Sequence, residues 1–257
     1  MPGSATVQVL AADPGTSGVL YSGTFSGDAY QKSAAGVWTV ASRDFAFDTI
    51  TSIMVSPANS NIILLGTEEF GAHRSGDGGR TWSPVPAGGP VAFVQMFRFS
   101  SANPLQVLAA TEGQGVYQSI DAGVHRNVTS PDVQADFSRD VIFHATEPRT
   151  LFASASGIDD VPISESTDGG ATWQRSGTGI TLTVTSLAVG VTNPGVVYAG
   201  TESGVYVSEI GASTFSFRLF VEGEPTGVRP IAVDPTNHLR IFAVTNKGVF
   251  TSESAGE

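Results

Sequence analysis

The sequence predicts an all-β protein built from six copies of one structural unit, and three observations lead to this prediction. A five-residue phrase, first seen as Leu-Tyr-Ser-Gly-Thr, recurs about every 44 residues at positions 20–24, 63–67, 107–111, 151–155, 197–201 and 241–245. A fixed period of about 40–50 residues is typical of a radial or stacked array of one supersecondary unit. Apolar residues alternate with a period of two, as they do in β-strands. Clusters of Asp, Pro, Asn, Ser and Gly between these segments predict tight turns.

Each copy divides into four short strands. The first strand carries two apolar residues two positions apart, which are Leu10 and Ala12, Ile53 and Val55, Phe97 and Phe99, Val141 and Phe143, Leu187 and Val189, and Ile231 and Val233. The phrase itself is the second strand, and its fourth residue is small in five copies: Gly23, Gly66, Ala110, Ser154 and Gly200. Small residues in strands allow a neighbouring backbone to come close. Val244 in the last copy departs from this pattern.

The turn before the fourth strand carries a distinct motif. Residues 75–82 read Ser-Gly-Asp-Gly-Gly-Arg-Thr-Trp and residues 166–173 read Ser-Thr-Asp-Gly-Gly-Ala-Thr-Trp. An Asp in a turn accepts hydrogen bonds from nearby backbone amides, a Gly supplies a positive φ, and a Trp anchors the chain in the core. We expect these roles for Ser75, Asp77, Gly79 and Trp82, for Ser166, Asp168, Gly170 and Trp173, and for Ser119 and Asp121 of a third copy that lacks the Trp.

This motif resembles the Asp-box, or bacterial neuraminidase repeat. Proteins similar in this respect are β-propellers: sialidases, xyloglucanase-type glycosidases, sortilin-type receptors and propellers like the photosystem II assembly factor. The resemblance implies one β-propeller domain over residues 1–257, with six blades of four antiparallel strands. We place the blades at 5–48, 49–91, 92–137, 138–183, 184–227 and 228–257. The last blade reaches the end of the sequence before its fourth strand, which leaves three alternatives open. The blade has only three strands, the chain is part of a longer one, or the ring closes imperfectly.

Composition excludes several classes of function. The chain has 13 Lys and Arg against 24 Asp and Glu, a net charge of −11 and an isoelectric point near 4.7. This balance argues against nucleic acid as a partner and favours a cationic one. Without cysteine there are no disulfides, thiolate metal sites or cysteine nucleophiles. No apolar run reaches the ~18 residues of a transmembrane helix. We find no signal peptide, but the resemblance implies a secreted or otherwise extracytoplasmic protein.

Carboxylates gather in the predicted loops between second and third strands. In β-propellers these loops open on the face where ligands usually bind. Two interpretations stay open: an acidic rim that attracts a cation or a basic partner, or a solvated edge. Calcium needs several oxygens at about 2.3–2.6 Å, and no Asp-x-Asp-x-Asp loop is present, so we expect no cofactor, with calcium as the alternative. The candidate binding residues are Asp28, Glu68, Glu69, Glu112, Asp159, Asp160 and Glu202.

We expect a non-catalytic binding or assembly scaffold that presents its loops to a protein or glycan partner. The alternative is a carbohydrate-active enzyme, sialidase-like or another glycoside hydrolase, with a site in a central pocket. A glycosidase needs two carboxylates about 5–10 Å apart, and a sialidase needs arginines for the substrate carboxylate and a Tyr nucleophile. The five tyrosines fall in second and third strands, away from such a pocket. If the protein is an enzyme, its candidate residues are Asp48, Asp140, Arg98, Arg139 and Arg229.

Overall fold

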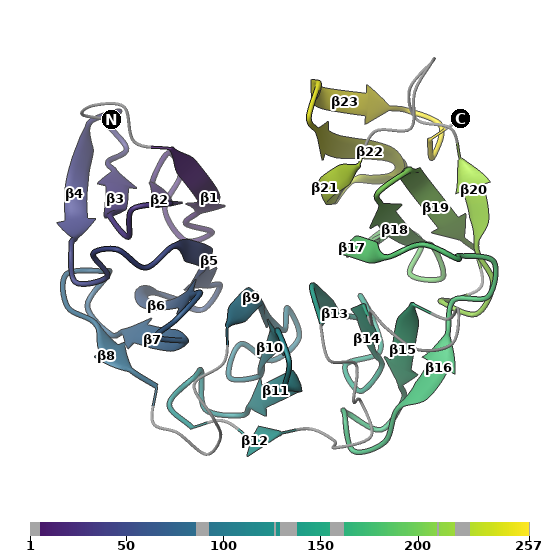
Figure 1. The fold of residues 1–257 in the computed structure, drawn as a ribbon, viewed down its shortest axis with the longest axis horizontal. Helices are drawn as coiled ribbons and strands as arrows, with labels where there is room; N and C mark the ends of the chain where they lie inside the picture. The colour runs from purple at the N-terminus through teal and green to yellow at the C-terminus, as the bar shows by residue number, and fades with distance from the viewer. Residues whose placement is uncertain are drawn as a thin grey trace. The chain divides into compact units, whose positions relative to one another are not determined.

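In the computed structural model every described element of regular structure is a β-strand, which confirms the all-β prediction (Figure 1). The structure describes residues 6–85, 93–125, 127–128, 138–154, 162–209, 211–218 and 227–256. Within these ranges, no helix has the length and apolar character that crossing a membrane requires. The chain divides into two compact units, Met1–Val128 and Thr129–Glu257, and each holds three sheets.

The first unit contains sheets 1 to 3, and in each sheet the four strands lie side by side in sequence order. All neighbouring strands are antiparallel. Sheet 1 consists of β1 (Val7–Ala12), β2 (Leu20–Thr24), β3 (Ala29–Lys32) and β4 (Trp38–Ser42). Sheet 2 consists of β5 (Ile50–Ser56), β6 (Asn59–Thr67), β7 (Ala72–Ser75) and β8 (Ser83–Pro84). Sheet 3 consists of β9 (Val94–Phe99), β10 (Val107–Thr111), β11 (Gly115–Ser119) and β12 (Asn127–Val128).

The second unit repeats this plan, but its last sheet has three strands in the described residues, as expected for an incomplete copy. Sheet 4 consists of β13 (Val141–Phe143), β14 (Leu151–Ser154), β15 (Ile163–Ser166) and β16 (Gln174–Ser176). Sheet 5 consists of β17 (Val184–Val189), β18 (Val197–Thr201), β19 (Gly204–Ser208) and β20 (Ser216–Arg218). Sheet 6 consists of β21 (Val228–Asp234), β22 (Asn237–Thr245) and β23 (Gly248–Ser252).

The core of each unit lies between consecutive sheets, because the repeated phrase in the second strand of sheets 1 to 5 is buried on both of its faces. In sheet 6 one face of β22 is partly open, where Phe242 and Val244 are exposed. In β6, Ile63 and Leu65 pack towards sheet 1 while Leu64 packs towards sheet 3. The same alternation in β18 sends Val197 towards sheet 4 and Tyr198 towards sheet 6. The phrase is therefore nearly all apolar or small, as expected for a strand covered on both sides.

The small fourth residue of the phrase lies where the first strand of the next sheet approaches. A Cβ added to Gly66 would lie 2.8 Å from Val94 Cγ1, and one added to Gly200 would lie 3.0 Å from Val228 Cγ1. The expected close approach of a neighbouring strand is thus confirmed at these positions. Val244, the exception in sheet 6, is 36% exposed.

The apolar pair of the first strand does not face the core in sheet 1. Leu10 is 58% exposed and Ala12 is exposed as well, whereas Val9 and Ala11 pack against the core. Alternation defines two faces of a strand, and a face is buried where a neighbouring sheet of the unit covers it. In sheet 1 this neighbour is sheet 2, and Val9 and Ala11 face it. Ile53, in the corresponding strand of sheet 2, faces sheet 1 and is buried.

A β-bulge occurs near the start of the first strand in sheets 1, 2, 3, 5 and 6. A bulge leaves one residue outside the ladder and re-aims its side chain. Two of these residues, Thr51 and Thr185, donate hydrogen bonds to the backbone carbonyls of Val94 and Val228, in the first strand of the following sheet. The bulges therefore help to tie consecutive sheets together.

Candidate functional site

The turns with the Ser-x-Asp motif form closed networks of hydrogen bonds. In sheet 2, Ser75 Oγ accepts the amide of Gly79 at 2.8 Å. One oxygen of Asp77 accepts the amides of Arg80 and Thr81, and the other accepts the Thr81 hydroxyl at 2.6 Å. These donors, led by the Thr81 hydroxyl and amide, hold the pKa of Asp77 well below its usual range. The turn is thus a structural clasp between the third and fourth strands.

The same network recurs in sheet 4. Ser166 Oγ accepts the amide of Gly170 at 2.8 Å, and Asp168 accepts the hydroxyl and the amide of Thr172 at 2.6 and 2.9 Å. These two bonds are the main cause that lowers the pKa of Asp168 to about 2. Trp173 is half-buried, and its indole nitrogen donates to the Gly170 carbonyl at 3.1 Å. The Trp closes the turn as well as packing, and it is less buried than we expected.

The third copy replaces the Thr of the motif with a histidine. Ser119 Oγ accepts the amide of Gly123 at 2.9 Å, and Asp121 accepts the amide of His125 at 2.9 Å and contacts its ring Nδ1 at 2.7 Å. Partial desolvation raises the pKa of Asp121, but the His125 amide, the Ser119 hydroxyl and the His125 ring outweigh it, so the pKa falls to about 2. The turn therefore keeps its form without the Thr.

A fourth turn of this kind lies in sheet 6, although its sequence lacks the Asp of the motif. In sheet 6, Ser252 Oγ accepts the amides of Ser254 and Gly256 at 3.2 and 2.9 Å, and Ala255 and Gly256 have φ values of 59° and 95°. Gly78 and Gly79 adopt 77° and 87° at the matching places. The spacing from Ser252 to Gly256 equals that from Ser75 to Gly79, and this spacing could have revealed the turn.

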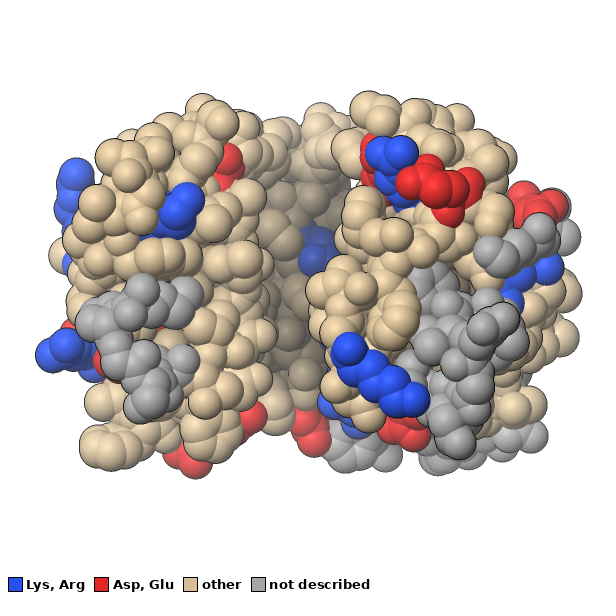
Figure 2. All heavy atoms as spheres, turned by 90° about the horizontal axis from the view of Figure 1, so that it is seen from above, with Lys and Arg blue, Asp and Glu red and all other residues tan. Residues whose placement is uncertain are grey.

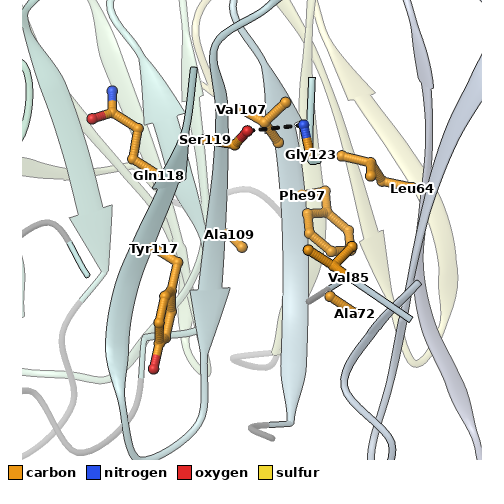
Figure 3. A pocket seen from close by; sticks show the side chains of 10 residues that line it. All are labelled: Leu64, Ala72, Val85, Phe97, Val107, Ala109, Tyr117, Gln118, Ser119 and Gly123. Atoms are coloured by element: carbon orange, nitrogen blue, oxygen red, sulfur yellow. Dashed lines mark hydrogen bonds between the residues drawn. The ribbon is translucent and has the colours of Figure 1, made fainter. Parts of the chain in front are cut away.

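A small apolar pocket of about 20 Å³ lies between sheets 2 and 3 (Figure 3). Gly123, which lines the pocket, corresponds to Gly79 in the preceding repeat. There the indole of Trp82 lies beside Gly79 and occupies the equivalent space. The third motif has arginine at residue 126 instead of Trp, and Ala109 stands where sheet 2 has Leu65. The pocket has room for about one water molecule, so we interpret it as missing side-chain volume. Its lining residues are Leu64, Ala72, Val85, Phe97, Val107, Ala109, Tyr117, Gln118, Ser119 and Gly123.

The predicted acidic residues occupy loops of both units. In the first unit, Glu68 and Glu69 are exposed, Asp28 faces the Arg43 guanidinium at 3.8 Å, and Glu112 accepts a hydrogen bond from Gln95 at 3.0 Å. Glu202 is exposed in the second unit. Asp159 and Asp160 lie outside the described residues. On the side drawn in Figure 2, charged side chains lie scattered among uncharged ones. Among the residues that the structure describes, no three His, Asp or Glu side chains come together as metal ligands.

Asp48, a candidate of the enzyme alternative, binds the backbone of a neighbouring loop. Its side chain is 1% exposed, and its two oxygens accept the amides of Glu69 and Phe70, each at 2.9 Å. These bonds fix the loop between β6 and β7 against the connection from β4 to β5. Asp48 is therefore a structural carboxylate that positions part of the predicted binding face.

Asp140 also binds backbone. It is 1% exposed, and its Oδ2 accepts the amide of Leu187 in the next sheet at 2.9 Å, while its Oδ1 accepts the amide of Val141. Arg139 Nε is buried and has no hydrogen-bond partner in the described part of the chain. Arg229 is exposed at the bulge of β21. Asp140 with these two arginines belongs to the second unit, and Asp48 with Arg98, which lies opposite Leu108 in sheet 3, belongs to the first.

Three exposed phenylalanines accompany the acids of the first unit. Phe25 is 62% exposed, Phe47 is 97% exposed and Phe70 is 57% exposed. They lie in the β2–β3 loop, the β4–β5 connection and the β6–β7 loop. The sequence analysis placed candidate binding acids in two of these segments, with Asp28 in the first and Glu68 and Glu69 in the third, but missed the three aromatic side chains as a group. Their spacing, 22 and 23 residues, is about half the repeat and was the available signal.

No family model and no curated protein matches the chain. Among solved structures, an ancestral GH74 enzyme aligns with a TM-score of 0.79 and 20% identity over 98% of this chain and 37% of that one. The GH74 xyloglucanase from Xanthomonas campestris aligns with a TM-score of 0.76 and 18% identity over 96% of this chain and 45% of that one. YCF48 bound to D1 peptide aligns with a TM-score of 0.73 and 13% identity, over 100% of this chain and 81% of that one.

These likenesses establish the fold. The GH74 enzymes and YCF48 are β-propellers, so the six sheets are the blades of a six-bladed β-propeller fold. The chain spans less than half the length of the two GH74 enzymes. Identity at this level carries no activity across, because propellers host unrelated functions on one architecture.

Proposed function

We propose that this protein is a non-catalytic scaffold whose loops bind a polypeptide partner. One observation carries the proposal: a buried carboxylate, Asp48, anchors a loop at the predicted binding face. Asp48 holds the β6–β7 loop through the amides of Glu69 and Phe70, and Asp140 holds sheet 5 through the amide of Leu187. Loops fixed on a rigid scaffold lose little conformational freedom on binding, which favours recognition.

Two further observations support a binding role. The exposed Phe25, Phe47 and Phe70 occupy loops at that face, and aromatic side chains supply much of the energy of protein interfaces. One solved structure with the same fold is YCF48 bound to D1 peptide, so this architecture can present a peptide-binding surface. A scaffold of this kind requires no cofactor, and calcium at the acidic loops would be an addition to it. We place the protein outside the cytoplasm as part of the same proposal, on the Asp-box resemblance.

Binding can be tested directly with a displayed library of random dodecapeptides panned against the immobilised protein. We expect enrichment of a peptide family that is competed by soluble protein. A parallel glycan array tests the other class of ligand named at the outset. Absence of any enriched peptide would overturn the polypeptide partner, and specific glycan binding would then identify the other class of ligand.

The enzyme alternative has its own test, motivated by the GH74 neighbours. The purified protein is incubated with a panel of aryl glycosides, beside Asp48→Asn and Asp140→Asn variants whose melting temperatures are measured first. We expect no turnover by any of the three proteins. Turnover by the wild type that disappears in a variant with an unchanged melting temperature would reject the scaffold and establish a glycoside hydrolase.

A further inference from the structure

Three exposed phenylalanines lie at one end of sheets 1 and 2. Because neighbouring strands are antiparallel, the β2–β3 loop, the β4–β5 connection and the β6–β7 loop all open at the same end of these sheets. Phe25, Phe47 and Phe70 come from these three segments. Exposed apolar residues are common singly, but a group of large ones on adjoining loops indicates an interaction site.

Two hydrogen bonds join the three loops. The amide of Phe47 donates to the carbonyl of Ser26, next to Phe25, at 3.2 Å. The amide of Phe70 donates to Asp48 Oδ2, next to Phe47, at 2.9 Å. The backbones that carry the phenylalanines therefore form one continuous structure. We call Phe25, Phe47 and Phe70 together the phenylalanine surface.

Phe47 is held away from the core by an unfavourable backbone conformation, so packing does not explain why its side chain is exposed. Its φ is 73°, in the left-handed region that bulky residues avoid, and its side chain is 97% exposed. Beside it, Gly27 lies so close to the Phe45 carbonyl that any side chain at residue 27 would collide with it. The connection thus buries Phe45 and holds Phe47 outward. Backbone strain of this kind concentrates at functional sites.

The charges around the phenylalanine surface are predominantly negative. Glu68 and Glu69 are exposed and directly precede Phe70, and Asp28 lies in the loop of Phe25. Arg43 is the cation of these three segments within the described residues, and it faces Asp28 at 3.8 Å. Phenylalanine offers no hydrogen-bonding group, so the surface suits apolar side chains, and the acids suit flanking positive charge.

We propose that the phenylalanine surface binds a peptide segment with apolar side chains flanked by Lys or Arg. This inference rests on the proposed function and specifies the chemistry of its partner. The apolar side chains pack on Phe25, Phe47 and Phe70, and the basic residues lie over Glu68 and Glu69. A neutral glycan has no positive charge to pair with the two carboxylates, which is why we favour the peptide.

The test uses peptides enriched from the dodecapeptide library on the wild-type protein, synthesised with a fluorophore and titrated by fluorescence anisotropy. The test variant is Phe25→Ser/Phe47→Asn/Phe70→Ser. The matched control is Val37→Ser/Leu105→Ser/Ile120→Ser, which removes three side chains that are 58%, 55% and 68% exposed in turns at the opposite end of the sheets. We expect the test variant to bind about tenfold or more weakly and the control to bind like the wild type.

Charge is tested with Glu68→Gln/Glu69→Gln and with added salt, both of which should weaken binding. Enriched peptides that bind the test variant as tightly as the wild type would overturn the phenylalanine surface while leaving the scaffold in place. Enriched peptides that are acidic, or whose affinity is insensitive to salt and to the Gln variant, would overturn the basic partner. If no peptide is enriched, the scaffold proposal fails together with this inference. If a neutral oligosaccharide binds the wild type and the control variant but not the test variant, the ligand of this surface is a glycan and not a peptide.

Discussion

Asp140 Oδ2 accepts a hydrogen bond of 2.9 Å from the backbone amide of Leu187, 47 residues further along the chain. The bond joins the residue directly before β13, in sheet 4, to β17, the first strand of sheet 5. Two other sheet pairs show the same bond with serine in place of Asp. Ser52 Oγ accepts the amide of Phe97, and Ser186 Oγ accepts the amide of Ile231, each at 3.1 Å. One position of the first strand thus satisfies a buried amide of the following sheet.

Replacing Asp140 with Ala should destabilise the second unit by about 1–3 kcal/mol, because the buried Leu187 amide would lose its acceptor. Urea denaturation followed by fluorescence measures the change. Asp140→Ser is the matched control, since serine serves as acceptor at this position in sheets 2 and 5. We expect the Ser variant to retain most of the stability. Equal losses in the two variants would show that the side-chain acceptor is unimportant.

Gly66→Ala should destabilise the first unit by about 1–3 kcal/mol through overpacking. The new Cβ would lie 2.8 Å from Val94 Cγ1 and 3.1 Å from the Val94 carbonyl oxygen. Val244→Ala changes the same position of the phrase in sheet 6, where the side chain is 36% exposed, and should cost less than about 1 kcal/mol. Thermal melting of both variants makes the comparison. A harmless Gly66→Ala change would contradict the close approach of Val94.

The Asp168 turn should make stability depend on pH in the acid range. The pKa of the Asp168 carboxyl group is about 2 in the folded protein, below the value of about 3.9 expected in the unfolded chain. The folded state therefore binds fewer protons, so this contribution is complete above about pH 5 and is lost as the pH falls towards 2. We expect Asp168→Asn to be less stable than the wild type at pH 7. The difference should shrink between pH 4 and 2 in denaturation curves, and a constant difference would refute the assignment.

Ala109→Leu should stabilise the first unit by about 0.5–2 kcal/mol by filling the pocket between sheets 2 and 3. Ala109 lines this pocket, and sheet 2 carries Leu65 at the same position of the phrase. Ala199→Leu is the matched control in sheet 5, where the alanine is fully buried and the added volume should destabilise by about 1–3 kcal/mol. Differential scanning calorimetry should show a higher melting temperature for Ala109→Leu and a lower one for Ala199→Leu. Destabilisation by Ala109→Leu would mean that the pocket cannot accept a larger side chain.

Phe47→Asn should raise stability by about 0.5–1 kcal/mol, because asparagine tolerates the left-handed conformation better than phenylalanine does. Little packing is lost, since the side chain is 97% exposed. Phe25→Asn serves as the control, because Phe25 is exposed but is not among the residues with positive φ. Guanidinium denaturation should show a gain for Phe47→Asn alone. A stability gain together with weaker peptide binding would separate the role of Phe47 in recognition from its effect on folding.

Much of the fold could be predicted because its signals are local. The period of the phrase predicted six sheets, and its small fourth residue predicted the close approach seen at Gly66 and Gly200. The pair Leu10 and Ala12 correctly predicted a strand but not its buried face, since an alternating pattern identifies the two faces of a strand and not the one that a neighbour covers. The turn at Ser252 was missed because it lacks the Asp that defines the motif.

The candidate site was less predictable. The acidic residues near the strand ends were visible, but their partners were not. Asp48 binds amides 21 and 22 residues away, and Phe70 becomes part of one surface with Phe25 only through the intervening connection. The positive φ of Phe47 had no signal in the sequence, which has no glycine at that position.

By itself, the sequence determined the repeating unit, the alternation within its strands and the turns that link them, because these depend on neighbouring residues and their backbone preferences. The tertiary structure decided that Asp48 and Asp140 bind backbone amides and that three separate loops present their phenylalanines together. The reason is physical: a buried carboxylate must find donors wherever the folded chain supplies them. Here the amides of Glu69, Phe70 and Leu187 come from a loop and a sheet that are 21 to 47 residues distant.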